Sequence, residues 1–261
     1  MKNKKHLLIC TCTVVPRVNR GLRRNNSKTR LQDYLNSLTY LFFQVKKLKN
    51  FDILIIENSG NINSLKLELA KHKFYNEIRH RVIFVNGRLD KVSAVQGISA
   101  GEHRMLRDVS LLSVINDYKT IWKISGRINV RNLNKILIKS SGDLIANRYF
   151  GNGHVFDTRI FGMSKIVFKD FVKNIPVYST KSARITSSKA AYTSIELYLA
   201  QYSLRIENCG MLVNSLARLP VYVGTSASTG KKLNTFKSLL ATRIANLIRR
   251  VVVKALIGIG P

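Results

Sequence analysis

Short apolar runs alternate with segments of helical periodicity in the first half of the chain. The apolar runs predict buried strands at residues 7–15, 51–56, 81–85 and around Trp122. Apolar residues at helical spacing predict helices at residues 31–48, from 62 to about 75, and within 97–116. Because strands and helices alternate, we predict an α/β fold: a Rossmann-type, mostly parallel sheet flanked by helices, with right-handed crossovers.

The pattern becomes less regular after residue 144. It predicts short strands at residues 143–146, 159–163 and 219–223, and a helix at about 191–201. Residues 149–154 read as an irregular loop. The chain has no internal repeat and no clear linker, so we predict one domain over residues 1–233.

Residues 235–257 have the pattern of an amphipathic helix. Its apolar positions are Phe236, Leu240, Ile244, Leu247, Ile248, Val251 and Val252, and its cations are Lys237, Arg243, Arg249, Arg250 and Lys254. The last 54 residues contain eight Lys or Arg and no acid. We therefore predict that residues 234–261 form a basic tail on an anionic membrane surface. A helix packed on the core, with a solvated basic face, is the alternative.

The composition adds a large positive charge to this picture. The chain has 44 Lys and Arg against 14 Asp and Glu, a formal net charge of +30. Such a surplus attracts nucleic acid, anionic lipid or phosphorylated substrates. No apolar run approaches the ~18 residues of a spanning helix, and the first one is too short for a signal peptide.

The three cysteines point to no metal or redox site. Cys10, Cys12 and Cys209 have neither the C-x-x-C spacing of redox sites nor a zinc pattern. We expect free thiols, as in a reducing cytosol, and Cys10 and Cys12 should point to the same side of the first strand.

The most informative segment is the end of the Trp122 strand. Ser125, Gly126 and Arg127 follow the apolar residues, and a helix is predicted to start at 129–132. Ligands of open α/β sheets bind at the carboxyl ends of strands, so this turn could hold a phosphate. No Asp-x-Asp sequence occurs here or elsewhere in the chain, and no set of His, Cys, Asp or Glu has metal-site spacing.

Four acidic residues are candidates for chemistry. Glu57, at the end of the second strand, could contact a nucleoside or could organise a turn. Glu102, near a helix start, is favoured there by the macrodipole alone. Asp157 and Glu196 could each act as a general base, or could form an ion pair in so basic a protein.

A loop rich in hydroxyls and lysines spans residues 224–232. Its spacing departs from that of a P-loop. Backbone N–H groups and Lys231 could still bind a diphosphate, whereas a plain linker to the tail is the alternative.

Seven segments, in this order, resemble those of bacterial glycosyltransferases that build lipopolysaccharide and capsule. They are Cys10-Thr-Cys-Thr13, Arg30-Leu-Gln-Asp-Tyr34, Glu57-Asn-Ser-Gly60, Gly97-Ile-Ser-Ala-Gly-Glu102, Trp122-Lys-Ile-Ser-Gly-Arg127, Phe156-Asp-Thr-Arg-Ile-Phe-Gly162 and Gly224-Thr-Ser-Ala-Ser-Thr-Gly-Lys231. The resemblance implies a GT-A-like fold, with a nucleotide-sugar-binding half at 1–142 and an acceptor-binding half at 143–233. Two positions depart from it: Ile128 stands where the family commonly has an aromatic residue, and Ala227 replaces the usual second glycine of the last loop.

The resemblance also implies roles for individual residues. In GT-A enzymes an Asp-x-Asp motif that binds a divalent metal follows this strand, and Arg127, helped by Lys231, would replace that metal. Asp157, Glu196 and Arg127 are the expected catalytic residues. The expected nucleotide-sugar-binding residues are Thr11, Thr13, Glu57, Asn58, Ser59, Gly101, Glu102, Lys123, Ser125, Gly126, Arg127 and Lys231.

The resemblance thus implies transfer of a sugar from a nucleotide sugar to a growing surface glycan, free or lipid-linked, at the cytoplasmic face of the inner membrane. No divalent metal and no nucleic acid partner are expected. Two other functions stay open: a basic nucleic-acid-binding protein, prompted by the charge, and an inactive homologue, prompted by the two departures. No known nucleic-acid-binding module occurs in the sequence.

Overall fold

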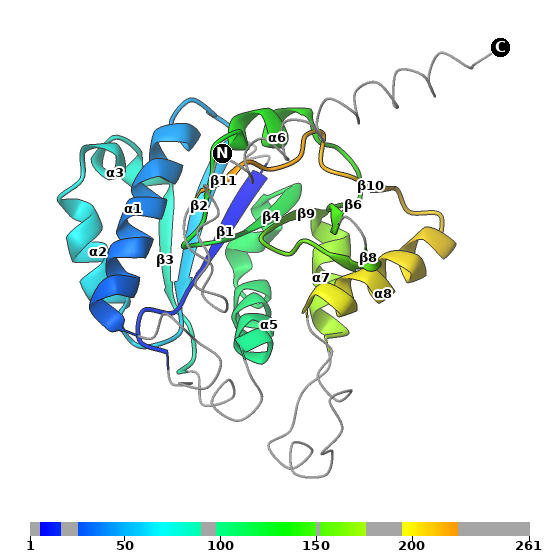
Figure 1. Cartoon of the computed structure of the whole chain (residues 1–261), viewed down its shortest axis with the longest axis horizontal. Helices are drawn as coiled ribbons and strands as arrows, with labels where there is room; N and C mark the ends of the chain where they lie inside the picture. The colour runs from blue at the N-terminus through cyan, green and yellow to red at the C-terminus, as the bar shows by residue number, and fades with distance from the viewer. Residues whose placement is uncertain (1–5, 17–25, 90–97, 150–151, 176–194, 224–261) are drawn as a thin grey trace, which may run out of the picture.

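A seven-stranded sheet in the order β10-β6-β9-β4-β1-β2-β3 forms the centre of the computed structural model (Figure 1). The structure describes residues 6–16, 26–89, 98–149, 152–175 and 195–223. The strands of this sheet are β1 (His6–Cys12), β2 (Phe51–Glu57), β3 (Val82–Asn86), β4 (Thr120–Ser125), β6 (Leu144–Ile145), β9 (Ile160–Ser164) and β10 (Val213–Asn214). All neighbouring strands pair in parallel except β9, which is antiparallel to both β4 and β6. The predicted α/β fold with a mostly parallel sheet is therefore confirmed.

Helices cover both faces of the sheet. One hydrophobic cluster joins it to α1 (Ser27–Val45), α2 (Ile62–Ala70), α3 (Lys73–Ile78) and α6 (Leu133–Lys139). A second cluster joins it to α5 (Ile98–Ser110), α7 (Lys165–Lys173) and α8 (Ile195–Asn208). Short 3-10 helices, η1 (Arg79–Arg81) and η2 (Ser113–Asp117), lead into β3 and β4. Because helices cover both faces of the sheet, the side chains on both sides of its central strands are apolar.

Strand β1 shows how the sequence produces this arrangement. Leu8, Cys10 and Cys12 belong to the first cluster, whereas Leu7 and Ile9 belong to the second, because alternate side chains point to opposite faces. All five are fully buried, and burying a side chain the size of Leu contributes about 1.5–3 kcal/mol. Cys10 and Cys12 are free thiols on one face, as expected.

Several elements differ from the sequence-based prediction. The helix expected at 62–75 is two helices, because His72 is extended (φ −97°, ψ 129°). The break lets Phe74 pack on Phe43 and Tyr75 pack on Phe42, with ring centroids 5.1 and 5.7 Å apart. Tertiary packing of aromatic rings has overridden local helical periodicity here.

The helix expected to start at 129–132 begins later. Asn129–Val130 forms β5, which pairs with β11 (Tyr222–Val223), and α6 starts at Leu133. Residues 148–156, expected to include an irregular loop, contain the hairpin β7 (Arg148–Tyr149) and β8 (Asn152–Phe156). The prediction also missed α7 and β10, which are too short for a clear periodic signal.

The reversed direction of β9 positions the site. Ile124 pairs with Ile160, and the Ser125 N–H donates to the Arg159 carbonyl over 2.9 Å. The residues that precede β9 therefore lie at the carboxyl end of β4. If β9 ran parallel to β4, these residues would lie at the opposite, amino end of β4.

The remaining expectations about organisation concern segments that the structure leaves out. The start of the helix expected at 191, the tail at 234–261 and Lys231 lie outside the described residues. Within the described residues, no helix combines the length and the apolar character needed to cross a bilayer. The central sheet takes strands from both of the predicted halves, 1–142 and 143–233.

Candidate active site

The candidate site lies at the carboxyl ends of β1 and β4. Along the chain, strands are added on one side of β1 as β2 and β3, and then on its other side as β4. Such a switch in strand order opens a crevice at the carboxyl ends, where open α/β sheets bind ligands. Thr11 of β1 and Ser125 of β4 are register partners at this point. The structure thus brings together residues that are far apart in sequence.

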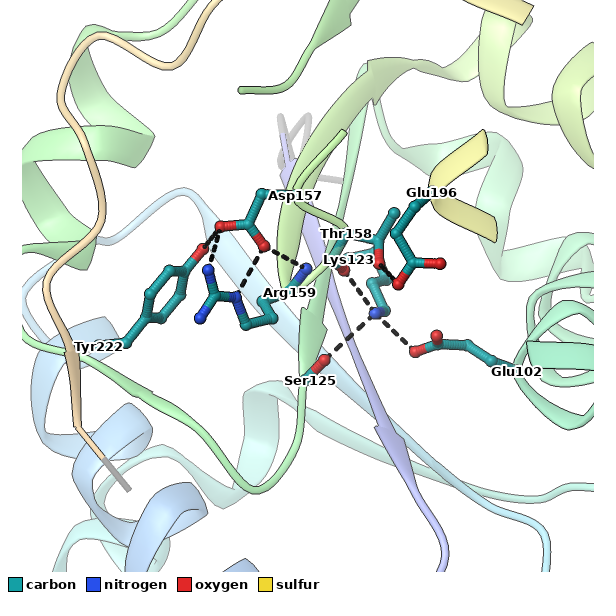
Figure 2. A network of polar contacts seen from close by, with 8 residues as sticks. All are labelled: Glu102, Lys123, Ser125, Asp157, Thr158, Arg159, Glu196 and Tyr222. Carbon is teal, nitrogen blue, oxygen red and sulfur yellow. Dashed lines mark hydrogen bonds and ion pairs between the residues drawn. The ribbon is translucent and has the colours of Figure 1, made fainter. Parts of the chain in front are cut away.

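Lys123 is the buried cation of the site. Its side chain is 1% exposed. Nζ lies 2.5 Å from Glu102 Oε1 and donates to the Thr158 carbonyl over 2.6 Å and to Ser125 Oγ over 3.3 Å (Figure 2). A buried ammonium is tolerated only when its donors are paired, and these three contacts pair them. Lys123 therefore links α5, β4 and the segment before β9.

Glu102 and Thr11 complete this buried network. The Thr11 hydroxyl donates to Glu102 Oε1 over 3.0 Å. Gly101 lies buried on α5, one residue before Glu102. Glu102 was expected either to bind the nucleotide sugar or to be structural, and its contacts are those of a counter-ion for Lys123.

Gly126 lets the turn after β4 pack onto the end of β1. A Cβ at this position would lie 2.7 Å from Cys12 Sγ and 2.9 Å from the Thr11 carbonyl oxygen. The Gly126 N–H donates to that same carbonyl over 3.2 Å. Glycine is therefore the residue that fits this turn, which directs Arg127 toward α1.

Two guanidinium groups converge on one tyrosine beside this turn. The Arg127 and Arg30 Cζ atoms lie 5.8 and 6.0 Å from the centroid of the Tyr34 ring. Burial lowers the pKa of Arg30, and the charge of Arg127 adds to this effect. Arg127 Nη1 is buried and has no hydrogen-bond partner among the described residues. Arg30 and Arg127 thus concentrate positive charge beside this turn, and Arg127 Nη1 is an N–H donor that no described residue uses.

Arg30 also supports the loop after β1. Its Nε and Nη2 donate to the Thr13 carbonyl over 2.9 and 2.5 Å. The Thr13 N–H donates to Tyr34 Oη over 2.7 Å. Sequence reasoning assigned no role to Arg30 or Tyr34, although both lie in the segment at 30–34 that carries the resemblance. Their spacing of one helical turn was the available signal.

Glu57 holds together the loops that follow β1 and β2. Its carboxylate accepts from the backbone N–H groups of Val14 (3.0 Å), Ser59 (3.0 Å) and Asn61 (2.7 Å), and from the Ser59 hydroxyl. These donors come from both loops, so the one carboxylate ties the loop after β1 to the loop after β2. Its contacts are those of a loop organiser, and a nucleoside contact by Glu57 stays a prediction.

Two predicted neighbours of Glu57 take part in the same loop structure. Thr13 Oγ1 donates to Asn58 Oδ1 over 2.7 Å, and the Val15 N–H donates to Ser59 Oγ over 3.0 Å. Thr13, Asn58 and Ser59 therefore lie together at the carboxyl edge, as their expected shared role requires.

Asp157 forms a closed cluster with Arg159 and Tyr222. Arg159 donates from Nε and Nη2, each over 2.8 Å, and Tyr222 Oη donates over 2.7 Å (Figure 2). The Arg159 guanidinium also lies 3.8 Å from the Tyr222 ring centroid. We call these three residues the Asp157 clamp. It fastens β11 to the segment before β9.

Glu196 lies in the first turn of α8 and faces the buried network. Its Oε1 accepts from the Thr158 hydroxyl over 3.0 Å. Its Oε2 makes no hydrogen bond or ion pair with the described residues, and the N-terminal end of a helix favours a carboxylate. Of the two acids expected as a base, Glu196 keeps one oxygen available and Asp157 has both oxygens bound.

The described residues contain no group of three or more His, Cys, Asp or Glu side chains that could hold a metal ion. Glu102 is paired instead with Lys123, and Asp157 with Arg159. Lys231, the second expected cation, lies outside the described residues.

Comparisons with known proteins add three distant structural similarities. The sequence matches no protein-family model and no curated protein. A proposed nucleotide-diphospho-sugar transferase from Desulfovibrio desulfuricans G20 aligns with a TM-score of 0.47 and 12% identity, over 83% of this chain and 80% of that one. The glycosyltransferase GlyE of Streptococcus pneumoniae TIGR4 aligns at 0.45 and 9%, over 82% of this chain and 45% of that one. An inositol-1-phosphate CTP transferase from T. maritima aligns at 0.43 and 12%, over 92% and 96%. Because the TM-scores are 0.47 or lower and the identities 12% or lower, these similarities assign no function to the chain.

Proposed function

We propose that the chain is a glycosyltransferase that moves a sugar from a nucleotide sugar to a growing bacterial surface glycan, in a reaction that needs no divalent metal. The acceptor hydroxyl loses its proton to a carboxylate, and its oxygen bonds to the anomeric carbon. The bond from that carbon to the diphosphate oxygen breaks, and the nucleoside diphosphate leaves. The protein must therefore supply a base and must stabilise the leaving diphosphate.

The observation that carries the proposal is the position of Arg127. It follows Gly126 at the carboxyl end of β4, beside Arg30, and its buried Nη1 has no partner among the described residues. A guanidinium presents donors in a fork that matches phosphate oxygens. At this point of the sheet, such a group can bind the diphosphate and stabilise its developing charge.

Arg127 also explains why a metal would be unnecessary. GT-A enzymes in general are expected to have a metal-binding Asp-x-Asp motif after this strand, and Ser125-Gly126-Arg127 stands there instead. The positive charge would then come from side chains, with Lys231 as a second cation.

Glu196 is the base that the contacts favour. A base needs an oxygen free to receive a proton, and among the described residues nothing binds Glu196 Oε2. Asp157 would have to release an arginine or a tyrosine first. We assign Asp157 to the clamp that holds β11, and Glu196 to proton abstraction.

The proposed setting is the cytoplasmic face of the inner membrane. A glycan acceptor, free or lipid-linked, would be met there, and the basic residues of 235–257 would bind anionic lipid. The net charge of +30 supports such a location.

The test uses the full chain with UDP-, GDP- and dTDP-sugars, with and without a bacterial membrane extract as acceptor source. Acceptor-dependent release of nucleotide, unchanged in EDTA, supports the proposal. Loss of transfer in EDTA, restored by Mn²⁺ or Mg²⁺, overturns metal independence. Release of a sugar 1-phosphate in place of the nucleoside diphosphate points to nucleotidyl transfer, and salt-sensitive nucleic acid binding without turnover points to the alternative function.

Arg127 variants test the central assignment. We expect Arg127→Ala to lower kcat about 100- to 1000-fold, the usual effect of removing a group that stabilises transition-state charge. Arg127→Lys should restore part of this loss because it keeps the charge without the fork. The matched control is Arg131→Ala, at an exposed arginine four residues further on. Equal rates for Arg127→Ala and Arg131→Ala would contradict the assignment.

A further inference from the structure

Thr158 connects two charged groups of the site through its two polar atoms. Its hydroxyl donates to Glu196 Oε1 over 3.0 Å, and its carbonyl oxygen accepts from Lys123 Nζ over 2.6 Å (Figure 2). We propose that Thr158 is a positioning residue, which holds the Glu196 carboxylate in the orientation that proton abstraction requires. This inference rests on the function proposed above.

Lys123 fixes the backbone of Thr158. Because Lys123 is 1% exposed, water cannot replace a lost partner of its ammonium. Moving the Thr158 carbonyl away would leave one donor of a buried charge unpaired. The Thr158 carbonyl is therefore held to β4 by the Lys123 ammonium. The next residue, Arg159, is held to β4 by the hydrogen bond from the Ser125 N–H to its carbonyl.

The Thr158 side chain is fixed as firmly as its backbone. Thr158 is 4% exposed, and its Cβ is branched, which restricts χ1 to few rotamers. Its hydroxyl is the group that the structure places on Glu196, whose own helix starts at Ile195. Without that hydrogen bond, the Glu196 side chain could occupy other staggered rotamers, which place the carboxylate elsewhere.

Thr158 thereby gives the two oxygens of Glu196 different tasks. Oε1 is held by the hydroxyl, and Oε2 is left to receive the proton. A base that is held at one oxygen approaches the acceptor in one geometry, and a displacement of about 1 Å can cost about 100-fold in rate. Thr158 would affect the rate of the chemical step, whereas binding of the donor would depend on Arg127 and Arg30.

Thr158→Val tests this role because valine keeps the shape and loses only the hydroxyl. We expect kcat to fall about 10- to 100-fold, with the KM of the donor within about 3-fold of wild type. Thr158→Ser restores the hydroxyl and should recover most of the rate. The matched control is Thr39→Val on α1, where the buried hydroxyl has no partner among the described residues.

A double-mutant cycle separates positioning from a general structural effect. In a Glu196→Gln background, Thr158→Val should lower kcat no further, because the group that it positions is already inactive. A fall in kcat that is the same in both backgrounds overturns the inference, as does failure of Thr158→Ser to recover the rate. Melting temperatures of all variants show whether each is folded.

The outcomes also separate this inference from the proposed function. If wild type transfers sugar and Thr158→Val does so at the wild-type rate, the positioning role is wrong and the proposed function stands. If wild type transfers no sugar from any donor, both are wrong.

Discussion

Gly162 lies directly across from Trp122 in the pairing of β9 with β4, and the indole occupies the space that a side chain at Gly162 would need. A Cβ added at Gly162 would lie 2.8 Å from Cδ2 and Cε3 of the indole. Trp122 is 1% exposed, so its ring has no room to withdraw. The contact joins the reversed strand to the centre of the sheet.

Gly162→Ala should therefore lower the free energy of unfolding by about 1–3 kcal/mol, the usual cost of overpacking a dense core. Urea unfolding measures this change. In a Trp122→Phe background, the smaller ring leaves space for the methyl group, so the same substitution should cost less. Equal costs in both backgrounds would show that the indole contact is not the cause.

Lys123→Met should lower the free energy of unfolding by about 3–5 kcal/mol, because it leaves the Glu102 carboxylate without its buried counter-ion. Adding Glu102→Gln removes the unpaired charge and should recover part of the loss. Lys135→Met, at an exposed lysine of α6, is the matched control and should cost little. Chemical denaturation of wild type and these three variants completes the comparison. A double variant no more stable than Lys123→Met would refute the ion-pair account.

Tyr222→Phe should loosen β11 without stopping catalysis. It removes the hydrogen bond to Asp157, which contributes about 0.5–1.5 kcal/mol. Hydrogen exchange at the Val221 amide, which donates to Asn132 Oδ1 next to β11, should become faster. Tyr40→Phe provides the same chemical change on α1 and should leave this exchange unaltered. Unchanged protection at Val221 in Tyr222→Phe would show that the clamp does not hold β11.

His103 should make the protein less stable in mild acid. Burial lowers the pKa of His103 to about 4, from an ordinary value of 6.5. The unfolded chain therefore binds a proton that the folded protein excludes, and stability falls as the pH drops from about 6.5 toward 4, by up to about 3 kcal/mol. His103→Gln should flatten this pH dependence, whereas His80→Gln, at an exposed histidine, should leave it as in wild type. If the free energy of unfolding fell with pH equally in wild type and in His103→Gln, His103 would not be the cause of the acid sensitivity.

The sequence was sufficient to predict the parts of the fold that depend on local pattern. Uninterrupted apolar runs such as 53–56 predicted the buried strands, because both of their faces are covered by helices. The direction of β9 could not be read in this way. Residues 159–163 look alike in a parallel and an antiparallel strand, since side-chain alternation has no direction.

The same distinction, between local pattern and contacts distant in sequence, applies to the residues of the candidate site. Ser125, Gly126 and Arg127 were identified because a polar turn after an apolar strand is a local signal. Thr158 was missed as a functional residue, because its role depends on Lys123 and Glu196, which lie 35 and 38 positions away. A hydroxyl that acts through partners so distant in sequence has no local signature.

The burial of Lys123 also bears on how the protein reaches its folded state. During synthesis, β1 to β4 and Arg127 emerge before residue 158, so a nascent sheet has the lysine but lacks the Thr158 carbonyl. Glu102 and Ser125 are then available to its ammonium, but the third partner comes only with the segment before β9. Docking of β9 supplies that carbonyl and seats Gly162 against Trp122. A sheet closed without it would bury the ammonium with one donor unpaired, which disfavours partly closed states. A single buried charge thereby couples completion of the fold to assembly of the site.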